Sequence, residues 1–141
     1  MELAEGGSGA MKGSVLFVSP SSDDARALQE MLSAIGIDCT HVRDLQQASM
    51  ALEARSFSAV LTEARLPDGT WEDVMRAATR LRQKVAVVVT DTLADARFWA
   101  EVLDRGVYDL IPKPFCRGEV QRILANAVDR PPLLASSISA A

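Results

Sequence analysis

Cysteine and histidine are scarce in this chain, which limits the sites that it can build. Its cysteines are Cys39 and Cys116, and its single histidine is His41. Two cysteines are too few for a disulfide-stapled fold and do not make a zinc site by themselves. We therefore interpret Cys39 as a small core residue, Cys116 as a structural residue at the start of the last helix, and His41 as a strand surface residue without a metal or catalytic role.

Other missing features exclude further classes of protein. No apolar run approaches the roughly 20 residues of a membrane span, and the purest run, 85–89, has the length of a strand. Residues 1–14 are acidic and glycine-rich and show no signal-peptide pattern. Lys and Arg number 15 against 19 Asp and Glu, so the net charge is −4 and no basic excess is available for nucleic acid. We expect a cytoplasmic domain that binds neither a membrane nor nucleic acid.

What is present suffices for one folded domain. A chain of 141 residues, of which 48% are hydrophobic, has material for a single core. Residues 1–14, which include Gly6-Gly7-Ser8-Gly9, predict a flexible leader. Residues 130–141 begin with Arg130 and Pro131-Pro132 and predict a flexible tail or the first part of a linker. The folded domain is therefore expected over 15–129.

Apolar runs of strand length alternate with segments of helical periodicity along this domain. Residues that cap helices separate them: Asp44 precedes one helical segment and Gly36 follows another. Ser22, Asp23 or Asp24 is expected to cap the first helix. Strands are predicted at 15–18, 37–42, 57–62, 85–90 and 107–111, and helices at 25–35, 45–52, 72–81, 95–105 and 118–128. Five such units with short connections predict an α/β domain whose parallel sheet is covered by helices on both faces.

Polar side chains follow the predicted strands. Ser19 comes after the first strand, Glu63 after the third, Thr90 and Asp91 at the end of the fourth, and Lys113 after the fifth. Because the carboxyl ends of parallel strands meet at one edge of a sheet, we expect a carboxylate, a hydroxyl and an ammonium group to converge there. An alternative is that these are ordinary strand-end residues, with the lysine in solvent.

Several segments resemble the receiver domain of two-component response regulators. The resemblance covers residue 15 to about residue 128 and implies a doubly wound, five-stranded, flavodoxin-like (βα)5 fold with strand order 2-1-3-4-5. The segments that carry it are Val15-Leu16-Phe17-Val18, Leu66-Pro67-Asp68-Gly69, Val87-Val88-Val89-Thr90 and Gly106-Val107-Tyr108-Asp109-Leu110-Ile111-Pro112-Lys113-Pro114-Phe115.

The resemblance implies a phosphoryl-accepting pocket, of which this chain keeps only a part. In the family, a histidine kinase passes a phosphoryl group to an aspartate, next to an acidic pair that binds Mg²⁺. The matching positions here are Ser19 and Pro20 for the acidic pair, Glu63 for the acceptor, Thr90 and Lys113 for the groups that contact the phosphoryl oxygens, and Leu110 for the switch aromatic. Because Mg²⁺ requires clustered oxygen ligands, we expect no metal and no cofactor.

The same comparison predicts how the altered pocket is arranged. We expect Glu63 to pair with Lys113, so that the pocket is permanently occupied and is not switched by phosphate. Asp24 is expected to serve the helix N-terminus rather than a metal, and Asp91 to reach the mouth of the pocket. The resemblance also implies a cis peptide bond before Pro114.

With this chemistry degenerate, we expect the domain to act by binding a protein, either a histidine kinase, an effector or a second copy. The family usually uses the face formed by the fourth helix, fifth strand and fifth helix. Phe98 and Tyr108 are the expected partly exposed contacts there, with Arg97, Arg105 and Arg117 around them. A solvated face is the alternative for each residue.

The same residues bear on three other functions. One is a phosphorylatable response regulator with an unusual acceptor, and another is the regulatory domain of a longer effector, with Pro131-Pro132 starting the linker. An enzyme is not expected, because no base, nucleophile or cofactor loop is convincing, and the glycine-rich stretch at 6–9 precedes any strand.

Overall fold

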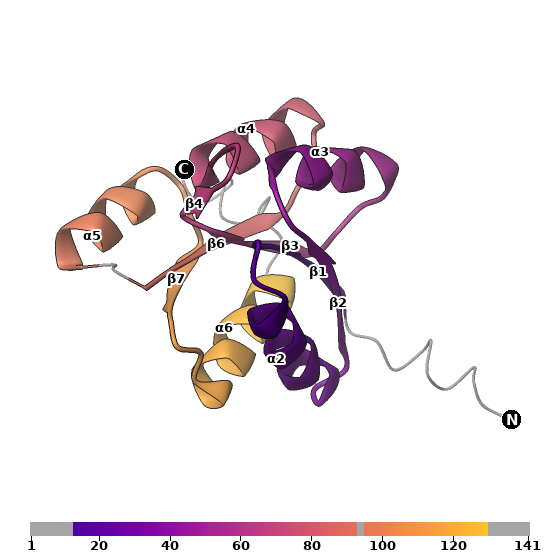
Figure 1. The fold of residues 1–141 in the computed structure, drawn as a ribbon, viewed down its shortest axis with the longest axis vertical. Coiled ribbons are helices and arrows are strands. Elements are labelled where there is room, and N and C mark those ends of the chain that lie inside the picture. The colour runs from indigo at the N-terminus through magenta and orange to yellow at the C-terminus, as the bar shows by residue number, and fades with distance from the viewer. Residues whose placement is uncertain (1–12, 93–94, 130–141) are drawn as a thin grey trace, which may run out of the picture.

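A five-stranded parallel sheet forms the centre of the computed structural model, which describes residues 13–92 and 95–129 (Figure 1). The strand order is β2-β1-β3-β6-β7, which confirms the predicted doubly wound fold. The strands are β1 (Gly13–Val18), β2 (Ile37–Val42), β3 (Ala59–Glu63), β6 (Ala86–Asp91) and β7 (Asp109–Pro112).

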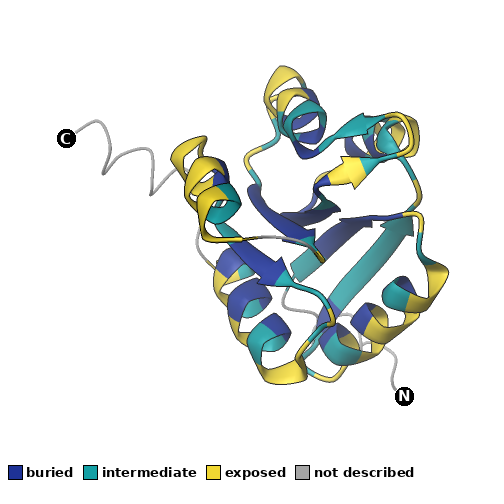
Figure 2. Ribbon diagram, turned by 60° about the vertical axis from the view of Figure 1, so that its left-hand side comes forward, coloured by how far each residue is buried: buried dark blue, intermediate teal, exposed yellow. Residues whose placement is uncertain are grey.

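Helices cover both faces of this sheet because its central strands are apolar on both sides. Successive side chains of a strand point to opposite faces. In β1, Val15 and Phe17 face α2 and α6, whereas Leu16 and Val18 face α3 and α4. All four are fully buried, and the sheet appears as the dark centre of Figure 2. The helices are α2 (Ser22–Ser33), α3 (Leu45–Ala54), α4 (Trp71–Arg80), α5 (Ala96–Asp104) and α6 (Arg117–Asp129).

The N-terminal boundary of the domain differs from the prediction. Strand β1 begins at Gly13, so the leader expected to reach residue 14 is too long by two residues. Ser14 is held by two hydrogen bonds to Ser58, one through its amide and one through its carbonyl group. A side chain at position 13 would collide with the side chains of Val128 and Ser58, which would have to move to make room for it. The predicted leader up to residue 12 and the tail at 130–141 lie outside the described residues.

The helix caps follow the sequence with one exception. Asp44 accepts a hydrogen bond from the amide of Gln47 at 2.8 Å, as expected. Helix α2 is capped instead by Ser21, whose side chain accepts from the amide of Asp24. The prediction that residues 22–24 supply this cap is therefore wrong. Gly36 has φ +80°, the left-handed conformation that its predicted role at a helix end requires.

The turn Leu66-Pro67-Asp68-Gly69 connects β4 (Arg65–Leu66) and β5 (Gly69–Thr70), a short antiparallel hairpin between Glu63 and α4. The Asp68 carboxylate accepts from the amides of Leu45 and Gln46, at 2.8 and 3.1 Å. These are free amides of the first turn of α3, so Asp68 ties the hairpin to that helix. In the sequence, Asp68 is only one residue of the Leu66-Pro67-Asp68-Gly69 segment, and nothing there indicates this contact.

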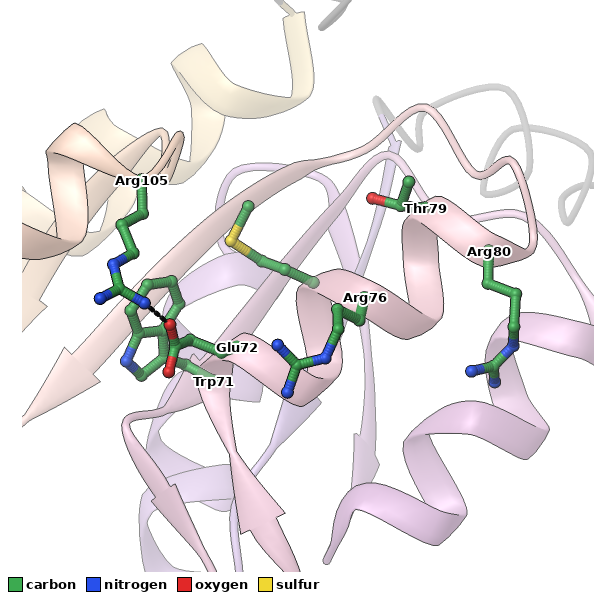
Figure 3. A pocket seen from close by; sticks show the side chains of 7 residues that line it. Trp71, Glu72, Arg76, Thr79, Arg80 and Arg105 are labelled. Carbon is green, nitrogen blue, oxygen red and sulfur yellow. Dashed lines mark hydrogen bonds and ion pairs between the residues drawn. The ribbon is translucent and has the colours of Figure 1, made fainter.

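A groove of about 480 Å³ lies along the outer side of α4 (Figure 3). It is separate from the strand ends at which the polar residues meet. Among the described residues, no helix combines the length and apolar character that crossing a bilayer requires.

Candidate functional site

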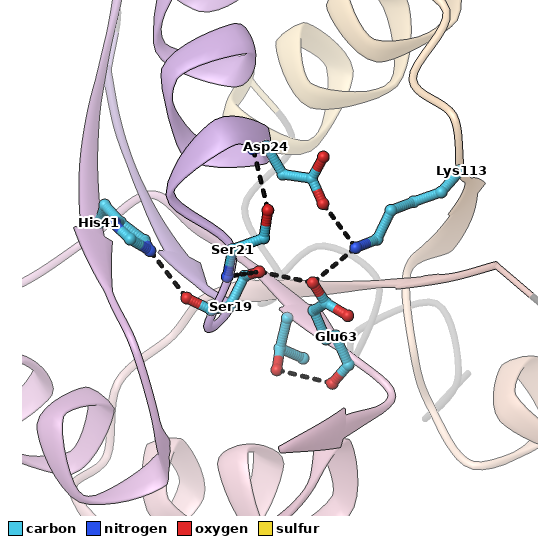
Figure 4. A network of polar contacts seen from close by, with 7 residues as sticks. Ser19, Ser21, Asp24, His41, Glu63 and Lys113 are labelled. Carbon is cyan, nitrogen blue, oxygen red and sulfur yellow. Dashed lines mark hydrogen bonds and ion pairs between the residues drawn. The ribbon is translucent and has the colours of Figure 1, made fainter. Parts of the chain in front are cut away.

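Four polar side chains meet where β1, β3 and β7 end (Figure 4). Ser19 follows β1, Glu63 is the last residue of β3, and Lys113 follows β7. Asp24 reaches them from the first turn of α2. The convergence arises because parallel strands present their carboxyl ends at one edge of the sheet.

Lys113 is the centre of this cluster. Its Nζ donates to Glu63 Oε2 and to Asp24 Oδ2, both at 2.6 Å. The expected contact between Glu63 and Lys113 is therefore present. The lysine side chain is 14% exposed and that of Glu63 is 17% exposed, so the ion pair is largely shielded from water. The Lys113–Pro114 peptide bond is cis, as the resemblance implied.

Asp24 is the member that the sequence interpretation missed. Its carboxylate binds Lys113 from a position 89 residues earlier in the chain, whereas we expected it to serve the N-terminus of α2. Ser21 already caps that helix, which leaves the Asp24 carboxylate available for the lysine. Asp23, its neighbour, is exposed and lies 3.8 Å from Arg26.

Ser19 fixes the other side of Glu63. Its hydroxyl donates to Glu63 Oε2 at 2.5 Å and accepts from the amide of Ser21 at 3.0 Å. His41 Nε2 donates to the carbonyl oxygen of Ser19 at 2.7 Å, and its ring lies 5.9 Å from that of Phe17. His41 lies on the edge strand β2 and is half-buried, and beyond the predicted place on a strand surface it supports the Ser19 backbone.

Three predicted pocket residues do not join the cluster. Thr90 is fully buried, but its Oγ1 has no hydrogen-bond partner in the described part of the chain. Asp91 accepts a bond from the Lys113 amide through its main-chain carbonyl, at 3.4 Å. Pro20 is exposed and has no side-chain oxygen. Fewer of the predicted pocket side chains therefore meet at the strand ends than the sequence indicated.

Leu110, at the position of the switch aromatic, is part of the core. It is 2% exposed and packs with Ala64, Trp71, Val89 and Val102. An aliphatic side chain here has no hydroxyl with which to follow a change at Thr90. The position therefore stabilises the packing of β7 against its neighbours.

Electrostatics keep the cluster charged. Burial lowers the pKa of Lys113, but hydrogen bonds and the charges of Asp24 and Glu63 outweigh it, so its pKa lies above the usual 10.5. The ammonium form is therefore retained at neutral pH. One cation then faces two carboxylates, and the Ser19 hydroxyl supplies a further hydrogen bond to the glutamate.

The residues of the predicted partner face are only partly exposed, and some already form ion pairs within the domain. Phe98 and Tyr108 are half-buried, and Leu103 of α5, which we did not single out, is 44% exposed. Two of the arginines expected around them are held elsewhere. Arg105 binds Glu72 and Glu101, and Arg117 binds Glu30 of α2 at 2.6 Å.

A (βα)5 sheet with a carboxylate ending β3 and a lysine after β7 is the arrangement that the resemblance to receiver domains of response regulators implies. No family model matches the chain. A curated relative is the response regulator protein PilR of Pseudomonas aeruginosa, 24% identical over 113 residues, a match that covers 80% of this chain and 25% of PilR. The chain thus spans about a quarter of that relative's length.

Solved structures agree with this class. The receiver domain of the sensor histidine kinase PA1611 from Pseudomonas aeruginosa PAO1, with a magnesium ion coordinated in its active site cleft, is 26% identical with a TM-score of 0.73. The beryllofluoride-activated NtrC4 receiver domain dimer is 18% identical with a TM-score of 0.77, which shows the fold alone. Each match covers 84% of this chain and 98% of the other. The predicted resemblance to the receiver family is confirmed.

Proposed function

We propose that this receiver domain is a partner-binding signalling module that works without Mg²⁺-dependent phosphorylation of an aspartate, in the manner of a pseudo-receiver. The observation that carries the proposal is the position of Lys113, whose ammonium group is bound by both Asp24 and Glu63. A fixed cation of the chain itself balances one of the two negative charges that the carboxylates of the pocket carry.

The donor set does not fit Mg²⁺. This ion requires a near-octahedral set of oxygen ligands, usually with one or two carboxylates supplied by the protein. Here Ser19 and Pro20 occupy the positions of the acidic pair, and the serine hydroxyl already serves Glu63. Asp24 and Glu63 share Lys113, and within 13–92 and 95–129 no group of three His, Cys, Asp or Glu side chains is arranged to hold a metal. We propose that the domain binds no Mg²⁺ and no cofactor.

The acceptor position is also unsuited to phosphoryl transfer. That reaction depends on positioning and on neutralising charge at the transferred group. Oε2 of Glu63 already accepts from Lys113 and Ser19, and Thr90 contacts neither the glutamate nor the lysine through its hydroxyl. We therefore propose neither phosphoryl acceptance nor another enzymatic activity.

With phosphorylation and catalysis set aside, binding of a protein partner is the function that we propose for the domain. We propose that a protein partner, a histidine kinase, an effector or a second copy, binds the face formed by α5, β7 and α6, where Phe98, Leu103 and Tyr108 expose apolar surface. The NtrC4 receiver domain, a structural neighbour, is described as a dimer, which supports the second copy. A cytoplasmic location fits such partners. Alanine at Phe98 and Tyr108 together, compared with alanine at exposed Met50 on α3, which lies outside this face, tests the face by sedimentation and by kinase pull-down.

A second candidate is the regulatory domain of a longer effector. It is favoured by the PilR match, because this chain corresponds to only a quarter of that response regulator. The two candidates are compatible, since a domain fixed in one state can still hold or recruit an effector.

Phosphorylation is tested by incubating the protein with acetyl phosphate and Mg²⁺ and measuring its intact mass. We expect no gain of a phosphoryl group, and no heat in a calorimetric titration with Mg²⁺, with or without beryllofluoride. The E63D variant should also stay unmodified because the metal ligands are still missing. The S19D/P20D/E63D variant should gain Mg²⁺ binding, and the PA1611 receiver domain serves as the positive control. A phosphoryl group on Glu63 of the unaltered protein would overturn the proposal and favour a receiver with an unusual acceptor.

A further inference from the structure

The groove along α4 has an apolar floor (Figure 3). Trp71, the first residue of the helix, is 6% exposed, and Met75, about one turn later, is half-buried and packs against two of the core clusters. The exposed Thr79 and Arg80 continue the same stripe to the end of the helix. With a rise of 1.5 Å per residue, the stripe is roughly 14 Å long. A surface of this length suits a segment of polypeptide that carries a few apolar side chains.

The charges around this floor balance. Arg76 binds Asp73, and Arg105 binds both Glu72 and Glu101. The third arginine of the lining ends the stripe and is exposed. Three guanidinium groups therefore stand beside three carboxylates, and the groove has no excess of either charge to offer to a charged ligand. An uncharged, partly apolar segment is the occupant that such a lining fits.

The chain itself contains a segment of this kind. Residues 131–141 have the sequence PPLLASSISAA, without a charged residue, and their large apolar side chains are those of Leu133, Leu134 and Ile138. Leu134 and Ile138 are four residues apart, a spacing that places two side chains on one side of the chain in both helical and extended conformations. The serine hydroxyls between and after them can accept hydrogen bonds from guanidinium groups.

This segment starts within reach of the groove. Helix α6 ends at Asp129, and the side chain of Val128 lies beside Gly13, the first residue of β1. Helix α4 ends at Arg80, shortly before β6 begins at Ala86. Both helices therefore end at the edge where the strands begin, although they cover opposite faces of the sheet (Figure 1).

The length of the segment is sufficient for this path. Helices on opposite faces of a sheet have axes roughly 20 Å apart, because each helix with its side chains is about 10–12 Å across. The chain after residue 129 has 12 residues and spans up to roughly 40 Å when extended. It can cross the edge of the sheet and then follow α4 from its last turn to its first.

We propose that residues 131–138 fold back onto α4 and occupy this groove, with Leu134 against Met75 and Ile138 against Trp71. A tethered segment has a high effective concentration at its site, so a shallow apolar contact suffices to hold it. The contact gives a fixed place to part of a segment that the sequence predicted as a flexible tail or linker. It covers α4 and directs a protein partner to the α5–β7–α6 face.

A nitroxide spin label on the variant S137C tests this placement in the full chain. The label is introduced in the C116S background, because Cys116 is exposed and would react as well. We expect the amide signals of Met75 and Thr79 to lose most of their intensity in the nuclear magnetic resonance spectrum. The signal of Arg26, near the start of α2 on the opposite face, should keep its intensity. The C116S protein treated with the same reagent gives the baseline for any labelling of Cys39.

Two substitutions within the segment provide a matched pair. I138S removes a side chain that the proposal buries, whereas L133S removes one that points to the other side of an extended chain. Burial of an aliphatic side chain of this size contributes roughly tenfold to such an equilibrium. I138S should therefore lower the docked-to-free ratio by roughly tenfold and restore the α4 signals, and L133S should leave them weakened. Neither residue belongs to the described fold, and coincident urea transitions verify that the domain is unchanged.

Three results would overturn the proposal. They are full intensity of the α4 signals in the labelled protein, equal effects of I138S and L133S, and an intermolecular origin of the signal loss. The last is measured by mixing spin-labelled protein with isotope-enriched protein that carries no label. Loss of α4 signals in that mixture would assign the groove to a second copy of this chain. None of these results bears on the phosphorylation test, so the two proposals fail independently.

Discussion

Replacing Lys113 by methionine is the most direct perturbation of the strand-end cluster. Methionine keeps much of the length of the side chain but removes the ammonium group that Asp24 and Glu63 share. Two hydrogen bonds to charged groups are lost, each of which contributes about 1.5–3 kcal/mol. The two carboxylate oxygens lie 2.6 Å from the same nitrogen and so are no more than about 5 Å apart.

The repulsion that remains between the Asp24 and Glu63 carboxylates determines how much stability K113M loses. Two like charges about 5 Å apart repel by roughly 3 kcal/mol at an effective dielectric constant near 20. Asp24 is 31% exposed, so water screens part of this, and loss of the buried ammonium group removes its desolvation cost. We expect K113M to lower the free energy of unfolding by about 2–4 kcal/mol at pH 7.

Urea unfolding followed by tryptophan fluorescence measures this loss. The E63Q/K113M double variant should recover most of the lost stability at pH 7 because only one of the two carboxylates remains charged. A loss below about 0.5 kcal/mol at pH 7, or a loss that E63Q does not reduce, would refute the role of Lys113 as the shared counter-charge.

Three further results are expected. Because the pKa of Lys113 is raised in the folded state, this lysine adds stability that is complete below its unfolded-state pKa near 10.5. This stability is lost as the pH rises through the folded-state pKa. The difference in urea midpoint between wild type and K113M should therefore narrow from pH 9 to pH 12. G106A should destabilise the fold by about 1–2 kcal/mol because the φ angle of Gly106 is +98°. G118A adds a Cβ to open space at the start of α6, so in the same assay it should be neutral or stabilise the fold by up to about 1 kcal/mol. Burial raises the pKa of Cys39 to about 12, so a maleimide at pH 8 should label the exposed Cys116 first and Cys39 only when the protein unfolds. In the C116S variant, mass spectrometry then detects the labelling of Cys39 alone.

The fold was predictable because its signals are local. Continuous apolar runs mark strands buried on both faces, and Asp44 and Gly36 mark helix ends that the structure confirms. Element boundaries shifted by a few residues: the last strand was predicted at 107–111 but spans Asp109–Pro112. The strand order came with the family resemblance, since local pattern alone does not specify which strands are neighbours.

The site was predictable only where it follows the strand ends. Glu63 and Lys113 were placed by the rule that parallel strands end at one edge, and their contact was expected. Asp24 was misassigned because two carboxylates in a first helical turn have a sufficient local explanation, and a contact between residues 89 positions apart leaves no mark in a local pattern. The role of Asp68 was missed for the same reason, since the amides that it binds lie more than 20 residues earlier.

The shared lysine has a consequence for how this edge of the sheet responds to the cell. A dissociable ion leaves when its supply falls or a chelator competes for it, whereas a tethered side chain has an effective concentration set by the geometry of the chain. The cation between Asp24 and Glu63 is encoded in the sequence and never equilibrates with a reservoir. The arrangement of the strand ends is therefore as permanent as the fold itself.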